Sequence, residues 1–501
     1  MPIERITAPE SDLPLFGTTA SRRIEQRAAA MLPAHTLMRR AGESVARLAL
    51  ALAPHAQRVR IVAGPGNNGG DGFEAAMHLQ RAGRQVDVQF VGDAARLPAD
   101  AADALVRARG AGVHIGVQVP LPLGPHDLAI DALLGIGASR APDGALAEAI
   151  TSLSALPCPV LAVDLPSGLQ ADTGQPLGVC MRAQHTLALL SLKPGLFTAA
   201  GRDHAGSVWF DALGVDPADE SPDAWLAGAL YARRRARRHD AHKGSFGDVA
   251  VIGGAPGMSG AALLAARAAH AAGAGRVYVQ PLDASGPTLD PQRPELMFRA
   301  HWSDAAPDVL GQATVACGCG GGDEVRAVLP RLLGHVPWLV LDADALNAIA
   351  ADDTLRSLLR SRAARGHATV LTPHPLEAAR LLGASAREVQ ADRLKAATAL
   401  AQAHACTVLL KGSGSLIAAP DARRWINPTG NAALASAGTG DVLAGWIAGV
   451  WSQRPQDDAA GIAIGAAWLH GRAADHANVN VLRAADLIER MATLAASLER
   501  R

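Results

Sequence analysis

Short runs of apolar residues alternate with longer alanine-rich stretches along the whole chain. In the first half, six such runs have the composition of buried strands: residues 59–64, 85–92, 127–135, 159–168, 185–195 and 206–214. Each run ends in a glycine, proline or aspartate turn, and the stretches between the runs carry helical patterns. Strands and helices that alternate in this way form parallel sheets covered by helices on both faces. The pattern therefore predicts an α/β fold.

The same rhythm restarts in the second half. The strand candidates there are residues 248–254, 276–282, 314–322, 338–347, 368–374 and 407–418. A proline- and acid-rich segment, "GVDPADESPDAW", separates the two series, which places a boundary near residues 217–240. We therefore predict two α/β domains, residues 1–225 and residues 226–501.

Composition narrows the class of ligand. A chain of 501 residues with 49% apolar content is too long for one ordinary core, which agrees with two domains. The number of Lys and Arg residues (47) equals that of Asp and Glu residues (47), so the chain has no net positive charge that would attract nucleic acid or an acidic membrane surface. A small-molecule ligand is favoured instead.

Cysteine usage and the N-terminus indicate the compartment. The five cysteines lack paired metal-site spacing, and the glycine-rich neighbours of Cys317 and Cys319 favour a turn over a metal or redox pair. The N-terminus lacks the basic start and apolar run of a signal peptide, and no segment resembles a membrane-spanning helix. We expect a soluble cytoplasmic protein.

A glycine-rich motif follows the first predicted strand. Gly64, Gly66 and Gly69 satisfy G-x-G-x-x-G between a strand and a helix, which is typical of a nucleotide-type ligand. The segment "NNGGD" at residues 67–71 departs from that pattern by adding side-chain oxygens suited to a hard cation such as potassium, calcium or magnesium. The alternative is a tight turn with its asparagines in left-handed conformations.

Further polar side chains stand where predicted strands end. Asp131 follows one strand, and Asp164 and Ser167 follow another. Ligands of open α/β sheets bind at this edge, although a lone aspartate there is often only a helix cap. Several such strand ends in one domain favour a binding site over a set of caps.

The motifs "NNGGDG", "DALLGIG", "DLPSG" and "KPG" together resemble the YjeF N-terminal domain, the NAD(P)H-hydrate epimerase family, over roughly residues 10–220. The resemblance implies a Rossmann-like three-layer sandwich that interconverts the R and S hydrates of NADH and NADPH (NADHX and NADPHX). It implies potassium held by Asn68, Asp131 and Ser167, with Asp164 as acid/base and Lys193 as a further candidate for the proton chemistry. The implied dinucleotide contacts are Asn67, Asn68, Gly69, Gly70, Asp71, Gly135, Ile136, Gly137, Ala138, Ser139, Arg140 and Ala141. "LMRRAG" at residues 37–42 departs from the family, which usually has an acidic residue and asparagine before Ala-Gly.

The predicted second domain repeats the arrangement of glycine turns after strands. "LDADALN" places Asp342 and Asp344 at a strand end, and "LTPHPLE" offers His374. Lys411 follows a buried strand in "VLLKGSGSLIA", which is not a Walker A motif but permits a phosphate contact. A β-hairpin across residues 407–418 is compatible with that contact.

"SAGTGDVLAG" at residues 436–445 combines glycines with one acid. Gly438 and Gly440 would expose N–H groups to an anion at the start of a helix expected from about Asp441. Asp441 is then either a helix cap or a base that takes a hydroxyl proton while the N–H groups receive a phosphoryl group.

The motifs "HKGSFG", "GGAPGMSGAA", "DADALN", "TPHPLE", "LLKGSGS" and "AGTGDVLAG" resemble the ribokinase-like NAD(P)H-hydrate dehydratases, which depend on ADP or ATP, over roughly residues 230–495. The resemblance implies a ribokinase-like α/β domain with magnesium beside the nucleotide. It implies that the nucleotide contacts Lys411, Gly412, Ser413, Gly414, Ser415 and Gly440, and that Ala261, Gly320, His374 and Asp441 face the hydrate. "TGNAALASAGTGD" departs from the usual Asn-Pro-Gly-Met-Ala-Thr-Gly of the family.

An epimerase-like half followed by a dehydratase-like half predicts a bifunctional repair enzyme for damaged NADH and NADPH. The expected co-substrate is ADP, with ATP as the alternative, and we expect a homo-oligomer. One competing interpretation is a ribokinase-like kinase of a small molecule such as a vitamin precursor, with an accessory domain. Another is a non-catalytic first domain that only binds a dinucleotide or a partner.

Overall fold

The computed structural model describes residues 2–117, 122–217, 219–233 and 236–498, so residues 218, 234 and 235 of the predicted boundary lie outside the described residues. The chain divides into two units. One contains Met1–Thr7 and Pro14–Trp225, and the other contains Ala8–Leu13 and Leu226–Arg501. The units are divided between Trp225 and Leu226. A short early segment, Ala8–Leu13, also belongs to the second unit, and the sequence pattern does not indicate this.

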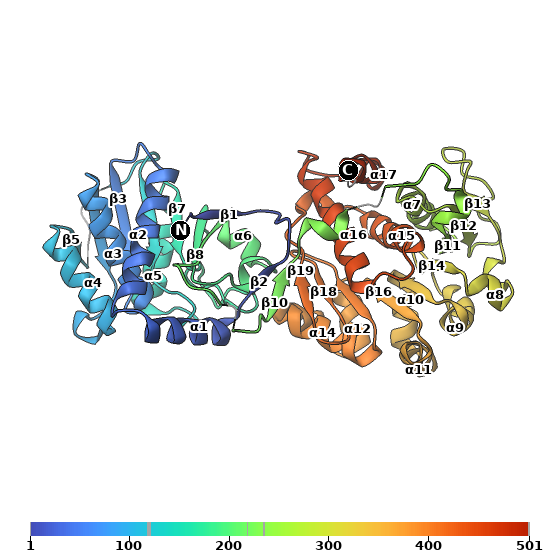
Figure 1. Cartoon of the computed structure of the whole chain (residues 1–501), viewed down its shortest axis with the longest axis horizontal. Coiled ribbons are helices and arrows are strands. Elements are labelled where there is room, and N and C mark those ends of the chain that lie inside the picture. The colour runs from blue at the N-terminus through green and yellow to red at the C-terminus, as the bar shows by residue number, and fades with distance from the viewer. Residues whose placement is uncertain (1, 118–121, 218, 234–235, 499–501) are drawn as a thin grey trace. The chain divides into compact units, whose positions relative to one another are not determined.

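The first unit is built on an eight-stranded sheet with the order β1-β9-β8-β7-β6-β3-β4-β5. Figure 1 shows the strands and helices of this unit in blue to green. Its strands are β1 (Glu4–Ile6), β3 (Arg58–Ala63), β4 (Gln85–Phe90), β5 (His114–Gly116), β6 (Leu128–Ala132), β7 (Val160–Val163), β8 (His185–Leu189) and β9 (Ser207–Asp211). All neighbouring pairs are parallel except β1 and β9. The six strands predicted for this half are confirmed, and the short edge strands β1 and β5 are additions.

Helices cover both faces of this sheet. They are α1 (Thr18–Met31), α2 (Thr36–Leu52), α3 (Asn67–Arg81), α4 (Ala99–Gly110), α5 (Gly144–Ser154) and α6 (Gly201–Ala205). Ile61 of β3 belongs to a core shared with α2, α3 and α4, whereas its neighbour Val62 belongs to a core shared with α5. Successive side chains of a strand point to opposite faces, so the sheet is the middle of three layers, as predicted.

The first and third glycines of the G-x-G-x-x-G motif, Gly64 and Gly69, permit close approach of backbone segments. A Cβ atom on Gly64 would lie 1.9 Å from the carbonyl oxygen of Leu133, and one on Gly69 would lie 2.0 Å from that of Gly64. The helix α3 already begins at Asn67, with Gly66 as its extended N-cap. The alternative of left-handed asparagines is therefore wrong: neither Asn67 nor Asn68 has a positive φ.

The second unit contains most of an eleven-stranded sheet with the order β13-β12-β11-β14-β15-β16-β17-β18-β19-β10-β2. Its strands are β2 (Leu13–Leu15), β10 (Ala224–Leu226), β11 (Asp248–Gly253), β12 (Arg276–Pro281), β13 (Met297–Phe298), β14 (Ala313–Cys317), β15 (Trp338–Leu341), β16 (Ala368–Leu371), β17 (Thr407–Leu410), β18 (Leu416–Ala418) and β19 (Arg424–Ile426). The strands from β13 to β17 are parallel, and β17, β18 and β19 are antiparallel. The hairpin expected at residues 407–418 is present.

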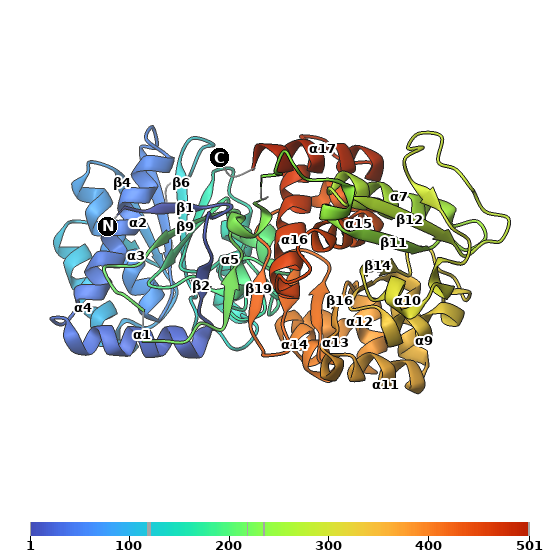
Figure 2. The same cartoon turned by 45° about the vertical axis from the view of Figure 1, so that its right-hand side comes forward.

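Two helices of this unit approach each other unusually closely. A Cβ atom on Gly445 of α15 (Thr439–Ser452) would lie 2.0 Å from the carbonyl oxygen of Ala265 on α7 (Ser259–Ala271), and one on Gly449 would lie 2.3 Å from that of Ala269. Figure 2 shows the two helices side by side. Small residues on both helices thus bring the start of α15 beside the start of α7. The helices are α7 (Ser259–Ala271), α8 (Pro307–Leu310), α9 (Val325–His335), α10 (Ala343–Ala351), α11 (Asp353–Ser361), α12 (Pro375–Leu382), α13 (Ala386–Ala391), α14 (Arg393–His404), α15 (Thr439–Ser452), α16 (Ala459–Asp475) and α17 (Ala484–Ser497).

The described helices include none that is both long and apolar enough to cross a membrane. All five cysteines are free thiols, so the fold is held by packing and hydrogen bonds without a disulfide.

Candidate functional site

A cavity of about 620 Å³ opens in the first unit, at the carboxyl ends of its central strands. Most of the residues predicted to contact a dinucleotide line it, and so do the predicted acid/base residues. The predicted residues in its wall are Asn67, Asn68, Asp71, Gly135, Ile136, Gly137, Ala138, Ser139, Arg140, Ala141, Asp164 and Lys193. Gly69 and Gly70 are absent from the wall: Gly69 packs on the backbone of Gly64, and Gly70 on Met38 and Ala101.

Asp164 stands in the cavity wall directly after β7. Its φ of 64° is unusual for a residue with a side chain, and its N–H donates a 2.8 Å hydrogen bond to the carbonyl oxygen of Leu187. The buried ammonium of Lys193 donates to the Asp164 carboxylate and, at 2.8 Å, to the carbonyl oxygen of Leu189. The structure thus brings together the two residues predicted for proton chemistry, and it fixes the carboxylate at the cavity.

The three predicted potassium ligands lie near this wall with unequal access. Asp131 and Ser167 are fully buried, and the Ser167 hydroxyl donates a 2.6 Å hydrogen bond to Asp131. The Asp131 carboxylate also accepts hydrogen bonds from the N–H groups of Ser167 (2.8 Å) and Leu133 (3.2 Å). Burial nevertheless raises the pKa of Asp131, because it disfavours the charged form.

Asn68 offers an independent test of whether these residues fit a cation. Its side-chain nitrogen is buried and has no hydrogen-bond partner among the described residues. Half a turn about the Cβ–Cγ bond would place the amide oxygen at that buried position, since the two ends of the amide have the same shape. A buried amide without a partner is compatible with a side chain that offers its oxygen to a cation.

Two more carboxyl groups face the same cavity. Glu25 of α1 and Asp71 of α3 line it together with Asp164. Burial, followed by the negative charge of Asp164, raises the pKa of Glu25 and raises that of Asp71 well above its usual value. These groups therefore keep their protons to higher pH than ordinary carboxyls. Sequence reasoning missed Glu25, because it lies in a helix away from the strand ends that signalled the other residues.

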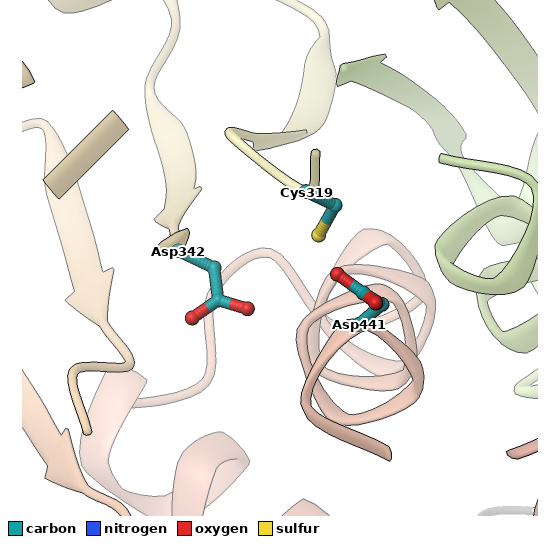
Figure 3. A group of neighbouring side chains, drawn as sticks. All are labelled: Cys319, Asp342 and Asp441. Carbon is teal, nitrogen blue, oxygen red and sulfur yellow. The ribbon is translucent and has the colours of Figure 1, made fainter. Parts of the chain in front are cut away.

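In the second unit, three loops meet at the carboxyl end of the sheet. Cys319 follows β14, Asp342 follows β15, and Asp441 lies in the first turn of α15. Figure 3 shows that their side chains point toward one another, and one ligand atom from each lies within 4.8 Å of the others. The sequence places Cys319 in a turn and Asp342 at a strand end, but the meeting of both with Asp441 is not predicted. The adjacency of β14 and β15 was the missing information.

Lys411 extends from the end of β17 into the same group of residues. Its ammonium donates a 2.6 Å hydrogen bond to Asp342, whose carboxylate also accepts one of 2.9 Å from Thr372. A Cβ atom on Gly440 would lie 3.3 Å from the Lys411 ammonium. Burial alone would lower the pKa of Lys411, but the charges of Asp342 and Glu377 outweigh it, and the pKa is raised. Lys411 therefore stays a cation beside the first turn of α15.

Asp441 lies in the first turn of α15 but does not cap that helix. The helix α15 begins at Thr439, slightly earlier than expected, with Gly438 as a left-handed N-cap and no capping side chain. Burial, with the charge of Asp342 next, raises the pKa of Asp441 to about 6, although a hydrogen bond with Cys319 and the charge of Lys411 act in the opposite direction. The capping interpretation is wrong, and the raised pKa means that the Asp441 carboxyl keeps its proton to higher pH than an ordinary aspartate.

The other predicted contacts of the hydrate are distributed around this group. Gly320 packs directly on α7, since a Cβ atom there would lie 2.9 Å from Ala261 and from Met258. His374 is the N-cap of α12, where its Nδ1 accepts hydrogen bonds from the N–H groups of Leu376 (3.1 Å) and Glu377 (3.4 Å). His374 thus has a structural use that is independent of any ligand.

Models of two known families match consecutive parts of the chain. The family described as the YjeF-related protein N-terminus matches residues 34–195, and the family described as NAD(P)H-hydrate dehydratase matches residues 249–493. The first match covers the cavity with Asp164, and the second covers the group around Asp441. Each unit therefore matches a family of its own, and the chain as a whole is a two-domain α/β enzyme.

Relatives that contain both parts are known. The chain is 36% identical over 473 residues to the bifunctional NAD(P)H-hydrate repair enzyme of Escherichia coli. The matched region covers 91% of this chain and 88% of that protein. It is also 36% identical to the enzyme of the same name from Moorella thermoacetica, with 94% of each chain covered. The chain belongs to the family of bifunctional NAD(P)H-hydrate repair enzymes, and the family predicted from the sequence is confirmed.

A solved structure similar to part of this chain is the ADP/ATP-dependent NAD(P)H-hydrate dehydratase of Bacillus subtilis, co-crystallised with ATP and Mg²⁺. It is 30% identical to this chain, covers 54% of this chain and 96% of its own, and superposes with a TM-score of 0.47.

Proposed function

We propose that this protein repairs hydrated NADH and NADPH in two steps, each carried out by one unit. The first unit interconverts the R and S hydrates, and the second dehydrates the S form at the expense of ADP or ATP. The observation that carries the proposal is the family membership over about nine tenths of the chain, together with a cavity carboxylate in the first unit and a buried carboxylate near pKa 6 in the second.

In the first unit, epimerisation requires one proton to move at the hydrated carbon, either during ring opening or during loss and re-addition of water. Asp164 takes the proton of the hydroxyl group in this proposal. Lys193 holds the carboxylate in its strained position, and residues 135–141 line the cavity that receives the dinucleotide. Asn68, Asp131 and Ser167 would hold potassium, which supplies a fixed positive charge for the phosphates.

In the second unit, Asp441 removes the hydroxyl proton of the S hydrate while the oxygen attacks the terminal phosphoryl group of the nucleotide. The N–H groups at the start of α15 and the ammonium of Lys411 face the developing negative charge. Phosphate then leaves with the electrons of the C–O bond, and loss of a proton from the neighbouring carbon restores the nicotinamide ring.

Magnesium fits the same location. Carboxylate oxygens are the ligands that Mg²⁺ prefers beside phosphates, and Asp342 would hold it there, which leaves Asp441 to act as the base. Burial and the charges of Asp441 and Asp342 raise the pKa of Cys319 well above its usual value, so the thiol keeps its proton and is no ligand for this ion.

Product analysis separates this proposal from a small-molecule kinase. The protein is incubated with the S hydrate, ADP and magnesium, and both the absorbance of the reduced nicotinamide ring and free phosphate are followed. We expect the two to appear in equal amounts. A phosphorylated compound that accumulates without return of the absorbance would contradict the dehydratase assignment.

A further inference from the structure

An arginine lies beneath the loop that we assign to the adenine nucleotide, Lys411–Ser415. Arg393 is the first residue of α14, and it is only 2% exposed. One terminal nitrogen, Nη2, donates hydrogen bonds to the carbonyl oxygens of Leu410 (3.3 Å) and Lys411 (3.2 Å), and Nη1 donates to Gln390 (2.6 Å). The guanidinium is therefore attached to the backbone where β17 runs into the loop.

The positive charge of Arg393 has no negative partner. Every acceptor just named is a neutral oxygen, and within the described parts of the chain no carboxylate lies at ion-pair distance from this guanidinium. Its Nε atom is buried without any acceptor among these residues. Burial lowers the pKa of Arg393 to about 10, so the group is still charged at neutral pH. A buried charge without a counterion is costly for stability, and this one lies directly beneath the loop assigned to the nucleotide, whose phosphates would supply the missing negative charge.

The contacts of Arg393 also determine the direction of a loop amide. A trans peptide unit is planar, and its N–H group points opposite to its C=O group. Because the carbonyl of Lys411 is turned toward Arg393, the N–H of Gly412 points away from it, toward the exposed side of the loop. In the described structure this N–H donates to no protein acceptor.

Gly412 fits this arrangement in two ways. Its φ of +135° is rarely adopted by residues with side chains, and a Cβ atom would lie 2.9 Å from the Nη1 atom of Arg393. The glycine therefore lets the loop rest directly on the guanidinium. An outward N–H above a buried positive charge is an arrangement that attracts phosphate oxygens.

We propose that Arg393 is a positioning residue for the phosphate end of the nucleotide: it turns the Gly412 N–H outward and supplies an uncompensated positive charge below the loop. The proposal rests on the proposed function, because the ligand is the ADP or ATP of the dehydratase. Arg393 does not touch the nucleotide. It acts through the backbone of Lys411 and Gly412.

The chain provides a matched control. Arg362 is 1% exposed, and it donates hydrogen bonds to the carbonyl oxygens of Leu333 (3.0 Å) and Ala368 (3.1 Å) and to the hydroxyl of Thr369 (2.7 Å). Like Arg393, it has no carboxylate at ion-pair distance among the described residues. Its contacts involve the ends of α9 and β16 and not the nucleotide loop. Arg362→Met therefore reproduces the loss of a buried arginine without a change at residues 411–415.

The test measures the binding of ADP and of adenosine, by calorimetry, to the full-length wild-type protein, Arg393→Met and Arg362→Met, together with the Tm of each. We expect Arg393→Met to weaken ADP about tenfold to a hundredfold while adenosine changes by less than about twofold. Arg362→Met should lower the Tm comparably and leave both affinities unchanged. Arg393→Lys, which keeps the charge but cannot reach both carbonyls, should lie between wild type and Arg393→Met, and it carries the test if Arg393→Met does not fold.

Three results would overturn the proposal. Unchanged ADP affinity in Arg393→Met, or in Arg393→Lys where only that variant folds, would show that the charge and the carbonyl contacts are irrelevant to the phosphates. An equal loss for ADP and adenosine would show a general structural effect. A wild-type protein that binds neither ADP nor ATP would contradict the proposed function itself, and this role of Arg393 with it.

Discussion

The thiol of Cys319 and the carboxylate of Asp441 lie within 4.8 Å of each other, although one follows β14 and the other lies in the first turn of α15. The contact joins the glycine-rich turn after the strand to the first turn of the helix, and it stabilises the charged form of the carboxylate. Because Asp441 is otherwise buried beside Asp342, its protonation state is set by a few identifiable neighbours. The pH dependence of the second reaction should therefore report on this group directly.

Dehydration should depend on pH through Asp441. Its pKa is raised to about 6, and only the deprotonated carboxylate accepts the hydroxyl proton. The kcat/KM for the S hydrate should therefore fall as the pH drops through about 6 and level off above it. Asp441→Asn should lower kcat by about 100-fold or more at every pH, because its amide cannot act as the base. A variant with near-normal kcat would rule out the assignment.

Cys319→Ala should move this pH profile upward. The thiol lowers the pKa of Asp441 by hydrogen bonding to its charged form, so its removal raises that pKa and shifts the acidic limb of kcat/KM to higher pH. Cys317→Ala removes a buried thiol from β14 without touching Asp441 and serves as the control. An unchanged limb, or one displaced to lower pH, is incompatible with the contact.

Asp164→Asn should separate the two activities. The amide keeps the shape of the side chain but cannot take a proton, so interconversion of the R and S hydrates should be lost while the second unit still dehydrates the S form. With an equal mixture of epimers and ADP, this variant should rapidly restore only the S fraction. Complete conversion at the wild-type rate would mean that Asp164 does not carry the epimerisation.

Potassium should stabilise the first unit through the Asn68 site. An ion that binds only the folded state raises Tm, and the buried amide of Asn68, which lacks a hydrogen-bond partner among the described residues, is a proposed ligand of that ion. Replacing tetramethylammonium by potassium should raise the wild-type Tm and the epimerisation rate. The Tm response should shrink in Asn68→Ala, where one ligand is missing. An equal Tm response in both proteins would place the ion elsewhere.

Gly445→Ala should destabilise the second unit, because the added Cβ atom would meet the carbonyl oxygen of Ala265 at 2.0 Å. Forcing an extra methyl group between two packed helices typically costs about 1–3 kcal/mol. Gly461→Ala in α16 is the matched control, since its Cβ atom would lie 3.5 Å from Tyr231 and alanine favours a helix. Thermal unfolding should show a lower Tm for Gly445→Ala only, and an unchanged Tm would contradict the close α7–α15 packing.

The strands of the two sheets were predictable because a buried strand appears in the sequence as a short apolar run that ends in a turn. Each apolar run that ends in a turn became a strand, including β3 and β17. The edge strand β1 could not be found in this way, because it is three residues long, partly exposed, and defined by its antiparallel pairing with β9. The order of strands also follows from packing between distant segments, which a local pattern does not contain.

The residues of the candidate sites were predictable only where polar or charged side chains directly follow a predicted strand. Asp131 and Ser167 were expected to act together, and they share a hydrogen bond. Glu25 and Cys319 gave no such signal: one lies in a helix, and the other stood in a glycine turn whose neighbours favoured a purely structural interpretation. The roles of all these residues stay predictions until the variants are measured.

The most direct test of the central claim is one assay on the wild-type protein. It is incubated with an equal mixture of the R and S hydrates of NADH, first with ADP and then with ATP, while the absorbance of NADH and free phosphate are followed. The account predicts that both epimers are fully converted with at least one of the two nucleotides, with one phosphate released for each NADH restored. Conversion that stops when the S form is exhausted would contradict the epimerase assignment, and phosphate transfer without restored NADH would contradict the dehydratase assignment.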